Sequence, residues 1–294
     1  MIPNNIFKTH KSLDFIFKNK RLREAHNSWS KWVNKGFSCY FYDDNRCDEF
    51  MLNYFPEIKD AYDKLPLKVM KADLWRYCII YKYGGIYHDA DTVLKVNPNF
   101  LTNFNNQYLV MVPENDTHFC NWIFAAPPKS PVLKSIIDLS VERIRSCKNI
   151  KGEHIIHYLT GPGVFTDGII GYLNLHKTSN LTQYGVGYKK INIGSSKNNS
   201  KTINIKNKID YNKELTFIHN YLDSFSYTLN GEDLTITRTD QDSGWGQNLD
   251  IYQFNCISNI VIMPFSIFHK EWINHLFSGS WRGGWCEERN KYLR

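Results

Sequence analysis

The chain has 294 residues, 42% of them hydrophobic and 15% aromatic, so it can bury a substantial core and has the size of one large α/β domain. Its 36 basic and 29 acidic residues give a formal charge of +7. The basic residues are spread along the chain, which argues against a nucleic-acid footprint, and a composition rich in Lys and Asn accounts for the charge.

Seven cysteines form no Cys-x-x-Cys pair and their number is odd, so we expect reduced thiols rather than a disulfide framework or a zinc site. The chain opens without a basic flank followed by an apolar core, and no apolar run approaches membrane-spanning length. We therefore expect no signal peptide or transmembrane helix, and a location in the cytoplasm or another reducing compartment.

Apolar periodicity predicts helices over residues 12–33, 48–65, 67–83 and 132–147. Strands are predicted at the start of the chain and at residues 38–41, 86–88 and 108–112. The alternation of these elements favours an α/β fold with a mainly parallel sheet flanked by helices. Further on, polarity rises over residues 189–212, and residues 227–237 predict a β-hairpin on an Asn-Gly turn.

The most informative stretch is Gly84 to Asp91, GGIYHDAD, which places two carboxylates one residue apart after a helix, a glycine stop and a short strand. Residues i and i+2 of a strand face the same side, so Asp89 and Asp91 can both reach one cleft. Hard oxygen ligands of this kind suit Mg²⁺ or Mn²⁺. The spacing therefore indicates a site for a metal ion and a diphosphate.

Within the helix predicted over 67–83, Asp73, Arg76 and Tyr77 are spaced i, i+3 and i+4, so an acid, a guanidinium and a phenol share one face. One interpretation is an ion pair on a solvated face. The other is a group that belongs to the site after the glycines.

The stretches 71–77 and 84–91 resemble the core signature of the glycosyltransferases with a DXD sugar-binding motif, family 32, and the clostridial glucosylating toxins are similar there. Further segments resemble that family in the same order. They are Ile2-Pro3 with residues 7–10, residues 28–32, residues 42–44, residues 121–126 with Pro131, residues 160–162, and residues 275–281. Seven blocks in the right order are far more specific than any one of them, and they span nearly the whole chain.

This resemblance implies a single GT-A-type, Rossmann-like domain over residues 1–294, with a variable insertion at 189–260 that contains the β-hairpin and a C-terminal flap at 270–294. It also implies a retaining transfer of a hexose from a nucleotide diphosphate sugar, UDP-linked, to a glycan or glycoprotein acceptor. Asp91 is expected to bind Mn²⁺ or Mg²⁺ directly, with His275 completing the coordination. Asp89 is expected to reach the sugar or ribose hydroxyls and to touch the metal through water.

Other residues receive roles through the same resemblance. Asp73 and Arg76 are expected to hold the donor sugar, and Ser280 and Trp281 to donate hydrogen bonds to the diphosphate. The remaining predicted nucleotide neighbours are Phe7, Thr9, His10, Tyr87 and Asn121. No carboxylate stands out as a covalent nucleophile, so front-face attack is the default, with Asp167, Asp240 and Asp242 as candidates for a base or nucleophile.

Two alternatives remain open. Asp89-Ala90-Asp91-Thr92-Val93 also matches the nucleophile loop of haloacid-dehalogenase-type phosphatases, in which the first Asp attacks phosphorus. That fold requires a fully apolar strand before the first Asp, and residues 84–88 are too short and too polar for it. The other alternative is a non-catalytic glycan-binding protein, against which the intact pair of aspartates argues.

Overall fold

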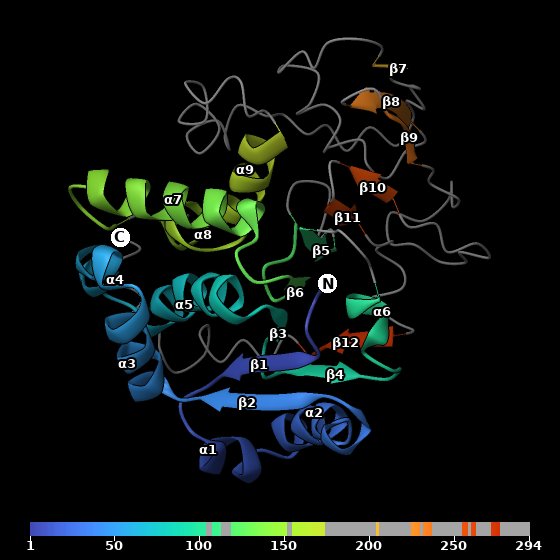
Figure 1. Ribbon diagram of the computed structural model, residues 1–294. Coiled ribbons are helices and arrows are strands. Elements are labelled where there is room, and N and C mark those ends of the chain that lie inside the picture. The colour runs from blue at the N-terminus through green and yellow to red at the C-terminus, as the bar shows by residue number, and fades with distance from the viewer. Residues whose placement is uncertain are drawn as a thin grey trace.

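The computed structural model describes residues 1–103, 108–112, 119–151, 155–173, 204–205, 225–229, 232–236, 255–257, 260–262 and 272–276. A seven-stranded sheet runs through the molecule in the order β10-β11-β5-β6-β3-β1-β2 (Figure 1). In chain order its strands are β1 (Asn5–Thr9), β2 (Ser38–Tyr42), β3 (Gly85–His88), β5 (Leu109–Met111), β6 (Ile123–Ala126), β10 (Asn255–Ile257) and β11 (Ile260–Ile262).

The sheet is mixed but mainly parallel. Strand β1 is parallel to both β2 and β3, and β11 is parallel to β5. Strand β6 is antiparallel to its neighbours β3 and β5, and β10 is antiparallel to β11. Five of the seven strands therefore run in one direction, which confirms the predicted α/β class.

Two small sheets accompany the large one. Strand β4 (Thr92–Leu94) pairs with β12 (Ile273–His275), and β8 (Phe225–Leu229) lies between β7 (Asn204–Ile205) and β9 (Glu232–Ile236). The antiparallel pairing of β8 with β9 confirms the predicted hairpin, while its turn, residues 230–231, lies outside the described residues. The rest of the predicted insertion, apart from β7 to β11, also lies outside them.

The helices are α1 (Leu13–Lys18), α2 (Lys20–Ser30), α3 (Asp44–Tyr54), α4 (Lys59–Lys64), α5 (Lys68–Tyr83), α6 (Asn99–Thr102), α7 (Pro131–Ser146), α8 (Ile155–Leu159) and α9 (Pro162–Leu173), with 3₁₀ turns at Val33–Lys35 and Pro56–Ile58. The prediction of single helices over 12–33 and 48–65 is wrong. Asn19 is extended and caps α2 by accepting from the N–H of Leu22, and Pro56, which has no N–H to donate, separates α3 from α4.

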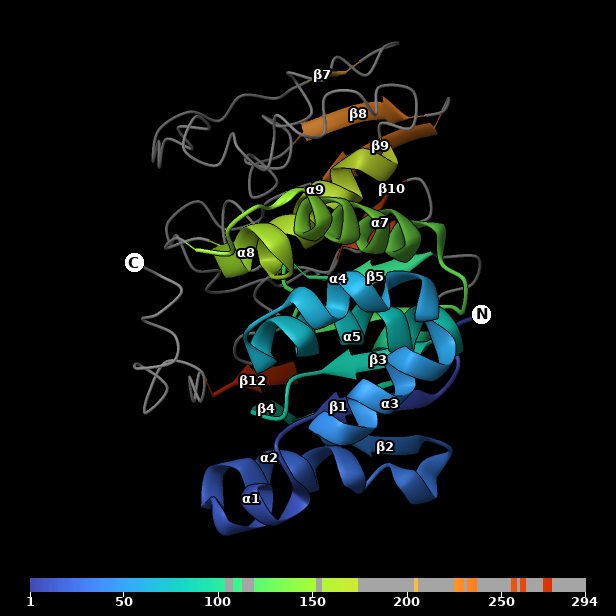
Figure 2. The ribbon, with the colours of Figure 1, turned by 90° about the vertical axis from the view of Figure 1, so that its left-hand side faces the viewer.

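The sheet separates two cores. Phe7 of β1 and Tyr87 of β3 point into the larger core, which α3, α4, α5 and α7 help to form. Ile6 and Ile86, one residue earlier on each strand, point the other way, into a core shared with α2 and β12. Figure 2 shows α1 and α2 at the end of the molecule beyond β1, β2 and β4.

The glycine stop after α5 is confirmed. The N–H of Gly84 donates to the carbonyl of Ile80 at 2.8 Å, and Gly84 and Gly85 have φ values of 65° and 121°, which favour glycine. A side chain at Gly85 would collide with the backbone carbonyl of Asn5 on β1. The absence of a side chain therefore lets the start of β3 lie directly against β1.

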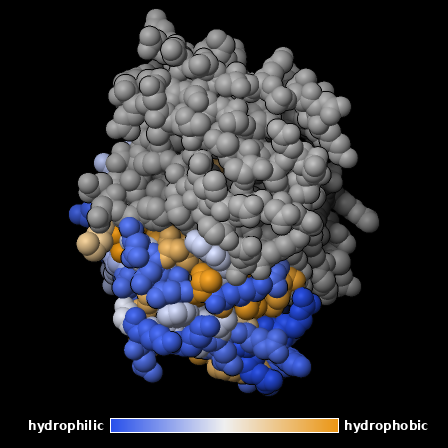
Figure 3. Space-filling view, turned by 90° about the vertical axis from the view of Figure 1, so that its right-hand side faces the viewer, coloured by the Kyte–Doolittle hydropathy of each residue, from blue (hydrophilic) through white to orange (hydrophobic). Residues whose placement is uncertain are grey.

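Five cysteines are free thiols, namely Cys39, Cys47, Cys78, Cys120 and Cys147. No helix in the described part of the chain has both the length and the apolar character needed to cross a bilayer. On the face seen in Figure 3, the described surface is mainly hydrophilic, with hydrophobic side chains between the hydrophilic ones.

Candidate active site

Asp89 and Asp91 lie in a tight turn between β3 and β4. The N–H of Asp89 donates to the carbonyl of Trp122 at 2.8 Å, and the N–H of Thr92 donates back to the carbonyl of Asp89 at 3.1 Å. Strand β3 ends at His88, as predicted, so the rule that residues i and i+2 of a strand face the same side does not apply to Asp89 and Asp91. The turn, rather than the pleat, positions the pair.

The turn is completed by a segment far along the chain. Strand β12 is antiparallel to β4 and places His275 opposite Thr92, and the N–H of Leu276 donates to the carbonyl of Asp91 at 2.9 Å. His275 Nε2 lies 3.1 Å from Asp91 Oδ1, and its imidazole stacks on Trp122 at 4.5 Å between ring centroids and 4° between planes. The structure thus brings together the three residues predicted to hold a metal.

These three side chains fit a divalent cation. One ligand atom each of Asp89, Asp91 and His275 can be chosen so that all lie within 4.8 Å of one another. Two carboxylates and one imidazole form a donor set that suits Mn²⁺ or another first-row divalent ion, whereas Mg²⁺ prefers oxygen alone. All three side chains remain partly exposed, at 28%, 14% and 11%, so an ion and a ligand can reach them.

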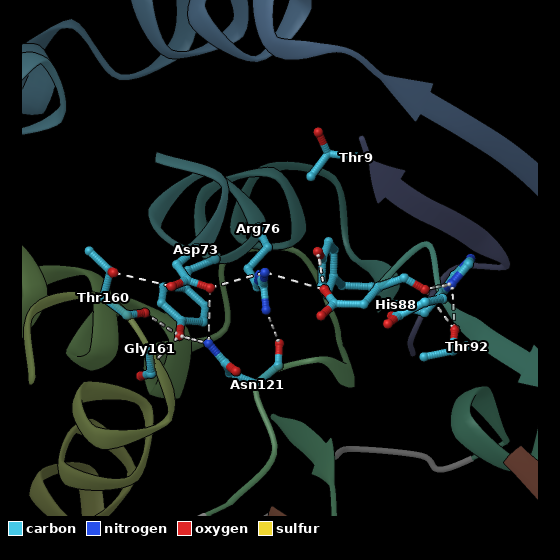
Figure 4. Close-up of polar contacts among 12 residues, drawn as sticks. Thr9, Asp73, Arg76, His88, Thr92, Asn121, Thr160 and Gly161 are labelled. Atoms are coloured by element: carbon cyan, nitrogen blue, oxygen red, sulfur yellow. Dashed lines mark hydrogen bonds and ion pairs between the residues drawn. The ribbon is translucent and has the colours of Figure 1, made fainter. Parts of the chain in front are cut away.

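Behind the turn, Asp73 and Arg76 of α5 are buried, and each side chain is 6% exposed. The interpretation as an ion pair on a solvated face is therefore wrong. Arg76 Nη2 lies 3.0 Å from Asp73 Oδ1 and 3.2 Å from Asp89 Oδ1, and Nη1 donates to the backbone carbonyl of Asn121 at 2.8 Å. One guanidinium thus joins α5 to the Asp89–Thr92 turn (Figure 4).

Tyr77, Asn121 and Thr160 contact this pair or one another. We call the five residues Asp73, Arg76, Tyr77, Asn121 and Thr160 the carboxylate network. Asn121 Nδ2 donates to Asp73 Oδ1 at 3.2 Å and to Tyr77 Oη at 3.0 Å. Thr160 Oγ1 donates to Asp73 Oδ2 at 3.1 Å, and Tyr77 Oη donates to the carbonyl of Thr160 at 2.7 Å. Asn121, predicted to contact the nucleotide, instead uses its amide to hold this network.

Burial shapes the acid–base behaviour of the network. Burial raises the pKa of Asp73 to about 7, the Arg76 guanidinium opposes that shift, and Asp89 adds to it. Burial also raises the pKa of Asp89, and Arg76 again opposes the shift. Tyr87 Oη donates to Asp89 Oδ1 at 2.6 Å. Arg76 is therefore the cation that keeps two neighbouring carboxylates compatible in one buried site.

The residues predicted to stack on the base occupy two environments. Phe7 and Tyr87 are each 1% exposed, and the ring of Phe7 stacks with Tyr40 at 5.0 Å and with Tyr83 at 6.2 Å. Their rings belong to the core, so the stacking role predicted for them is wrong. Thr9, with Oγ1 3.4 Å from Cys47 Sγ, and His10, which stacks on Phe15 at 5.0 Å, are only partly buried and stay candidates for contact with a ligand.

Sequence reasoning missed a group on the opposite face of the sheet, which we call the basic cluster, namely Lys8, His26 and His88. Lys8 Nζ, on a residue 6% exposed, donates to His26 Nδ1 at 2.6 Å. Burial lowers the pKa of Lys8 to about 8 and that of His26 to about 4, so an ammonium donates to a neutral imidazole at pH 7. Only the alternation of β1 and β3, which puts Lys8 and His88 on one face, could have indicated it.

His88 contacts the Asp89–Thr92 turn directly. Its ring stacks on Trp29 at 3.9 Å and 7°, and its Nδ1 lies 2.8 Å from Thr92 Oγ1 and 2.9 Å from the carbonyl of Asp89. Burial holds the pKa of His88 well below its usual range, so the imidazole is neutral, and these two oxygens make Nδ1 the donor. Trp29 Nε1 donates to the carbonyl of Thr92 at 2.9 Å, so the turn is fixed on this side as well.

Several other predicted residues lie elsewhere. Asp167, a candidate base or nucleophile, is 3% exposed, and its Oδ2 lies 2.6 Å from Arg143 Nη2 between α9 and α7, so it serves the helix layer. Ser280, Trp281, Asp240 and Asp242 lie outside the described residues.

Comparison with known proteins finds a family model that matches the part of the chain containing this site. Residues 4–112 match the model of the glycosyltransferase sugar-binding region containing a DXD motif, and this range includes Asp73, Arg76, Asp89 and Asp91. Residues 4–112 are therefore similar to the sugar-binding region of the DXD glycosyltransferases. This similarity favours the glycosyltransferase interpretation of the aspartate pair over the phosphatase one.

Among its curated relatives, the initiation-specific α-1,6-mannosyltransferase of Candida albicans is 29% identical over 207 residues, 58% of this chain and 53% of the relative. The protein of the same name from Schizosaccharomyces pombe is 33% identical over 140 residues, 40% of this chain and 35% of the relative. The chain thus spans about half the length, or less, of these relatives. The solved PaToxG glycosyltransferase has a TM-score of 0.43 and 19% identity, over 64% of this chain and 76% of that one.

Proposed function

We propose that this chain is a metal-dependent hexosyltransferase that moves a hexose from a nucleotide diphosphate sugar onto a glycan or protein-borne acceptor. The observation that carries the proposal is the cluster of Asp89, Asp91 and His275, whose ligand atoms lie within 4.8 Å of one another at the rim of a buried Arg76–Asp73 network. The DXD region that the family model matches contains both aspartates.

The donor in this proposal is UDP-linked, as the family resemblance implies. GDP-linked mannose is the second candidate, because two relatives are named α-1,6-mannosyltransferases. When bound, the divalent ion neutralises the charge that grows on the departing diphosphate. The Mn²⁺ preference of the donor set supports that role.

The protein groups have separate tasks in this proposal. Asp91, His275 and Asp89 would hold the ion. Arg76 contacts both Asp89 and Asp73, and so fixes the direction of the Asp89 carboxylate. We further propose retention at the anomeric carbon by front-face attack. Asp167, the candidate nucleophile that the structure describes, is held in its ion pair with Arg143, which supports this route.

The decisive experiment is a calorimetric panel of UDP-glucose, UDP-galactose and GDP-mannose, each with Mn²⁺, Mg²⁺ or a chelator, on the parent, Asp91→Asn and Asp138→Asn. Asp91→Asn removes a ligand charge at nearly equal volume, so it should fold normally and lose metal-dependent binding by more than about 100-fold, since outer-shell changes alone cost 10–100-fold. Asp138→Asn, an exposed change on α7, should match the parent.

Slow hydrolysis of one donor to free sugar and nucleoside diphosphate is the activity we expect from the parent with Mn²⁺. Normal binding and turnover by Asp91→Asn would contradict the site. Release of inorganic phosphate from small phosphomonoesters, with a beryllium fluoride adduct on Asp89 and no hydrolysis of nucleotide sugars, would favour the phosphatase alternative instead.

A further inference from the structure

One end of the molecule exposes three large apolar side chains within five residues. Leu13, Phe15 and Phe17 of α1 are 39%, 39% and 43% exposed, whereas Ile16 between them is fully buried. Ile16 packs in a small cluster with Leu22 of α2 and Ala90 of the Asp89–Thr92 turn. Helix α1 is thus anchored by Ile16 while its other large apolar side chains face solvent. The proposed transferase activity gives these exposed side chains no role.

Basic side chains surround these residues. Over residues 11–24 the chain carries Lys11, Lys18, Lys20, Arg21 and Arg23 against Asp14 and Glu24, which is 5 − 2 = +3, and all seven are exposed. The ammonium of Lys11 lies over the ring of Phe15, 5.2 Å from its centroid. We call these five basic residues, with Leu13, Phe15 and Phe17, the α1 surface.

We infer that the α1 surface binds an anionic membrane. Aromatic and leucine side chains flanked by lysines and arginines are the combination by which protein surfaces bind the boundary between headgroups and acyl chains. The rings and the leucine enter the apolar layer, while the long basic side chains reach the negative headgroups. A soluble polyanion would need the cations but would gain nothing from Leu13 and Phe17, which is why the observations favour a membrane.

This surface adjoins the candidate active site. Phe15 stacks on His10, and Arg21 Nη2 donates to the carbonyl of Leu276 at 3.3 Å. The N–H of the same Leu276 donates to the carbonyl of Asp91. Docking through α1 would therefore hold the Asp89–Asp91 turn close to the membrane, within reach of a membrane-borne acceptor. The inference goes beyond the proposed transferase activity and does not depend on it.

The test is sedimentation of the full chain with vesicles of phosphatidylcholine alone or of phosphatidylcholine mixed with phosphatidylserine, at low and high salt. The parent should bind the mixed vesicles, bind the neutral ones far more weakly, and lose binding at high salt. Lys11→Gln with Lys20→Gln should weaken binding about thirtyfold, because two basic residues near an anionic surface contribute roughly 2 kcal/mol and 1.4 kcal/mol is tenfold. The matched control is Lys68→Gln with Lys82→Gln, two exposed lysines on α5, which should leave binding unchanged.

A second pair of variants tests the apolar half of the surface. Leu13→Ser with Phe17→Ser should weaken binding about tenfold at an unchanged melting temperature, because both side chains are already partly in water. The control is Val33→Ser with Leu52→Ser, which are 45% and 57% exposed elsewhere on the molecule.

The inference is overturned if the parent binds neither kind of vesicle or binds both equally, or if the two lysine pairs weaken binding to the same extent. It is also overturned if Leu13→Ser with Phe17→Ser binds like the parent, because the surface would then be a general site for polyanions. None of these measurements uses a nucleotide sugar, so their failure can be told apart from failure of the proposed transferase activity.

Discussion

The Asp89–Thr92 turn is held from both faces of the sheet, by two groups of polar residues built in opposite ways. The carboxylate network pairs the negative charges of Asp73 and Asp89 with the guanidinium of Arg76, and both oxygens of Asp73 accept hydrogen bonds. The basic cluster has no acid among the contacts described for it, and its ammonium donates to a neutral imidazole. The first arrangement fixes the Asp89 carboxylate, a candidate metal ligand, whereas the second leaves a cation buried at a cost in stability.

Removal of Arg76 should have the largest effect. Arg76→Met leaves Asp73 and Asp89 without their shared cation, so the free energy of unfolding in urea should fall by about 3–5 kcal/mol. Arg143→Met breaks the buried pair with Asp167 in the helix layer and serves as the matched control, with a similar loss of stability.

Nucleotide binding separates these two variants. Arg143→Met, where folded, should keep Mn²⁺-dependent binding, and Arg76→Met should lose it. Should Arg76→Met fail to fold, Arg76→Lys, which keeps the charge but not the forked geometry, should fold and still bind weakly. Parent-like binding by Arg76→Lys would mean that the network needs only the charge.

A smaller effect is expected from His88, on the basic face of the turn. His88→Leu keeps most of the volume against Trp29 but removes the ring nitrogen near Thr92 Oγ1 and the Asp89 carbonyl. Apparent Mn²⁺ affinity in the presence of nucleotide should fall about 10-fold, at the lower end of the range for residues that support metal ligands. Thr92→Val removes the hydroxyl that contacts His88 Nδ1 and the Asp89 carbonyl, and it should lower the Mn²⁺ affinity in the same way. A parent-like Mn²⁺ titration for both variants would show that β3 and β12 alone position the turn.

The smallest effect is a gain. Burial holds the pKa of Lys8 near 8, below its ordinary 10.5, so the folded chain binds fewer protons at this site than the unfolded chain between these two pH values. Lys8→Met should therefore be more stable than the parent at pH 7, by about 1–3 kcal/mol, and the difference should narrow as pH rises from about 8 to about 10.5. Urea unfolding at several pH values measures it, and a variant less stable than the parent at pH 7 would show that the contact with His26 outweighs burial of the charge.

Sequence patterns predicted the elements that depend on neighbouring residues, such as a helix and the glycine stop after it. The helix predicted at 67–83 is α5 at 68–83, and the two glycines after it have the expected positive φ. What the sequence did not predict are the contacts between residues far apart along the chain. Arg76 reaches Asn121, Tyr77 reaches Thr160, and His88 meets Trp29, and no periodicity in the sequence links those pairs.

His275 is a residue whose position was predicted without any local signal in the sequence. Its predicted place beside Asp91 depended on resemblance to a family, because nothing local in residues 273–276 indicates a metal ligand. The pairing of β12 with β4 supplies the physical reason, and only the tertiary structure contains it. The helix divided at Asn19 has the opposite cause, since a capping residue overrode a periodicity that continued through it.

The pairing of β12 with β4 also joins two segments that lie far apart along the chain, at the turn that carries Asp89 and Asp91. The entropy of closing a flexible loop grows only with the logarithm of its length, so doubling the loop costs about 0.6 kcal/mol. Separation along the chain therefore adds little to the entropic cost of bringing His275 to Asp91. The candidate site can in this way take its side chains from two distant parts of the described chain, with Asp89 and Asp91 following β3 and His275 at the end of β12.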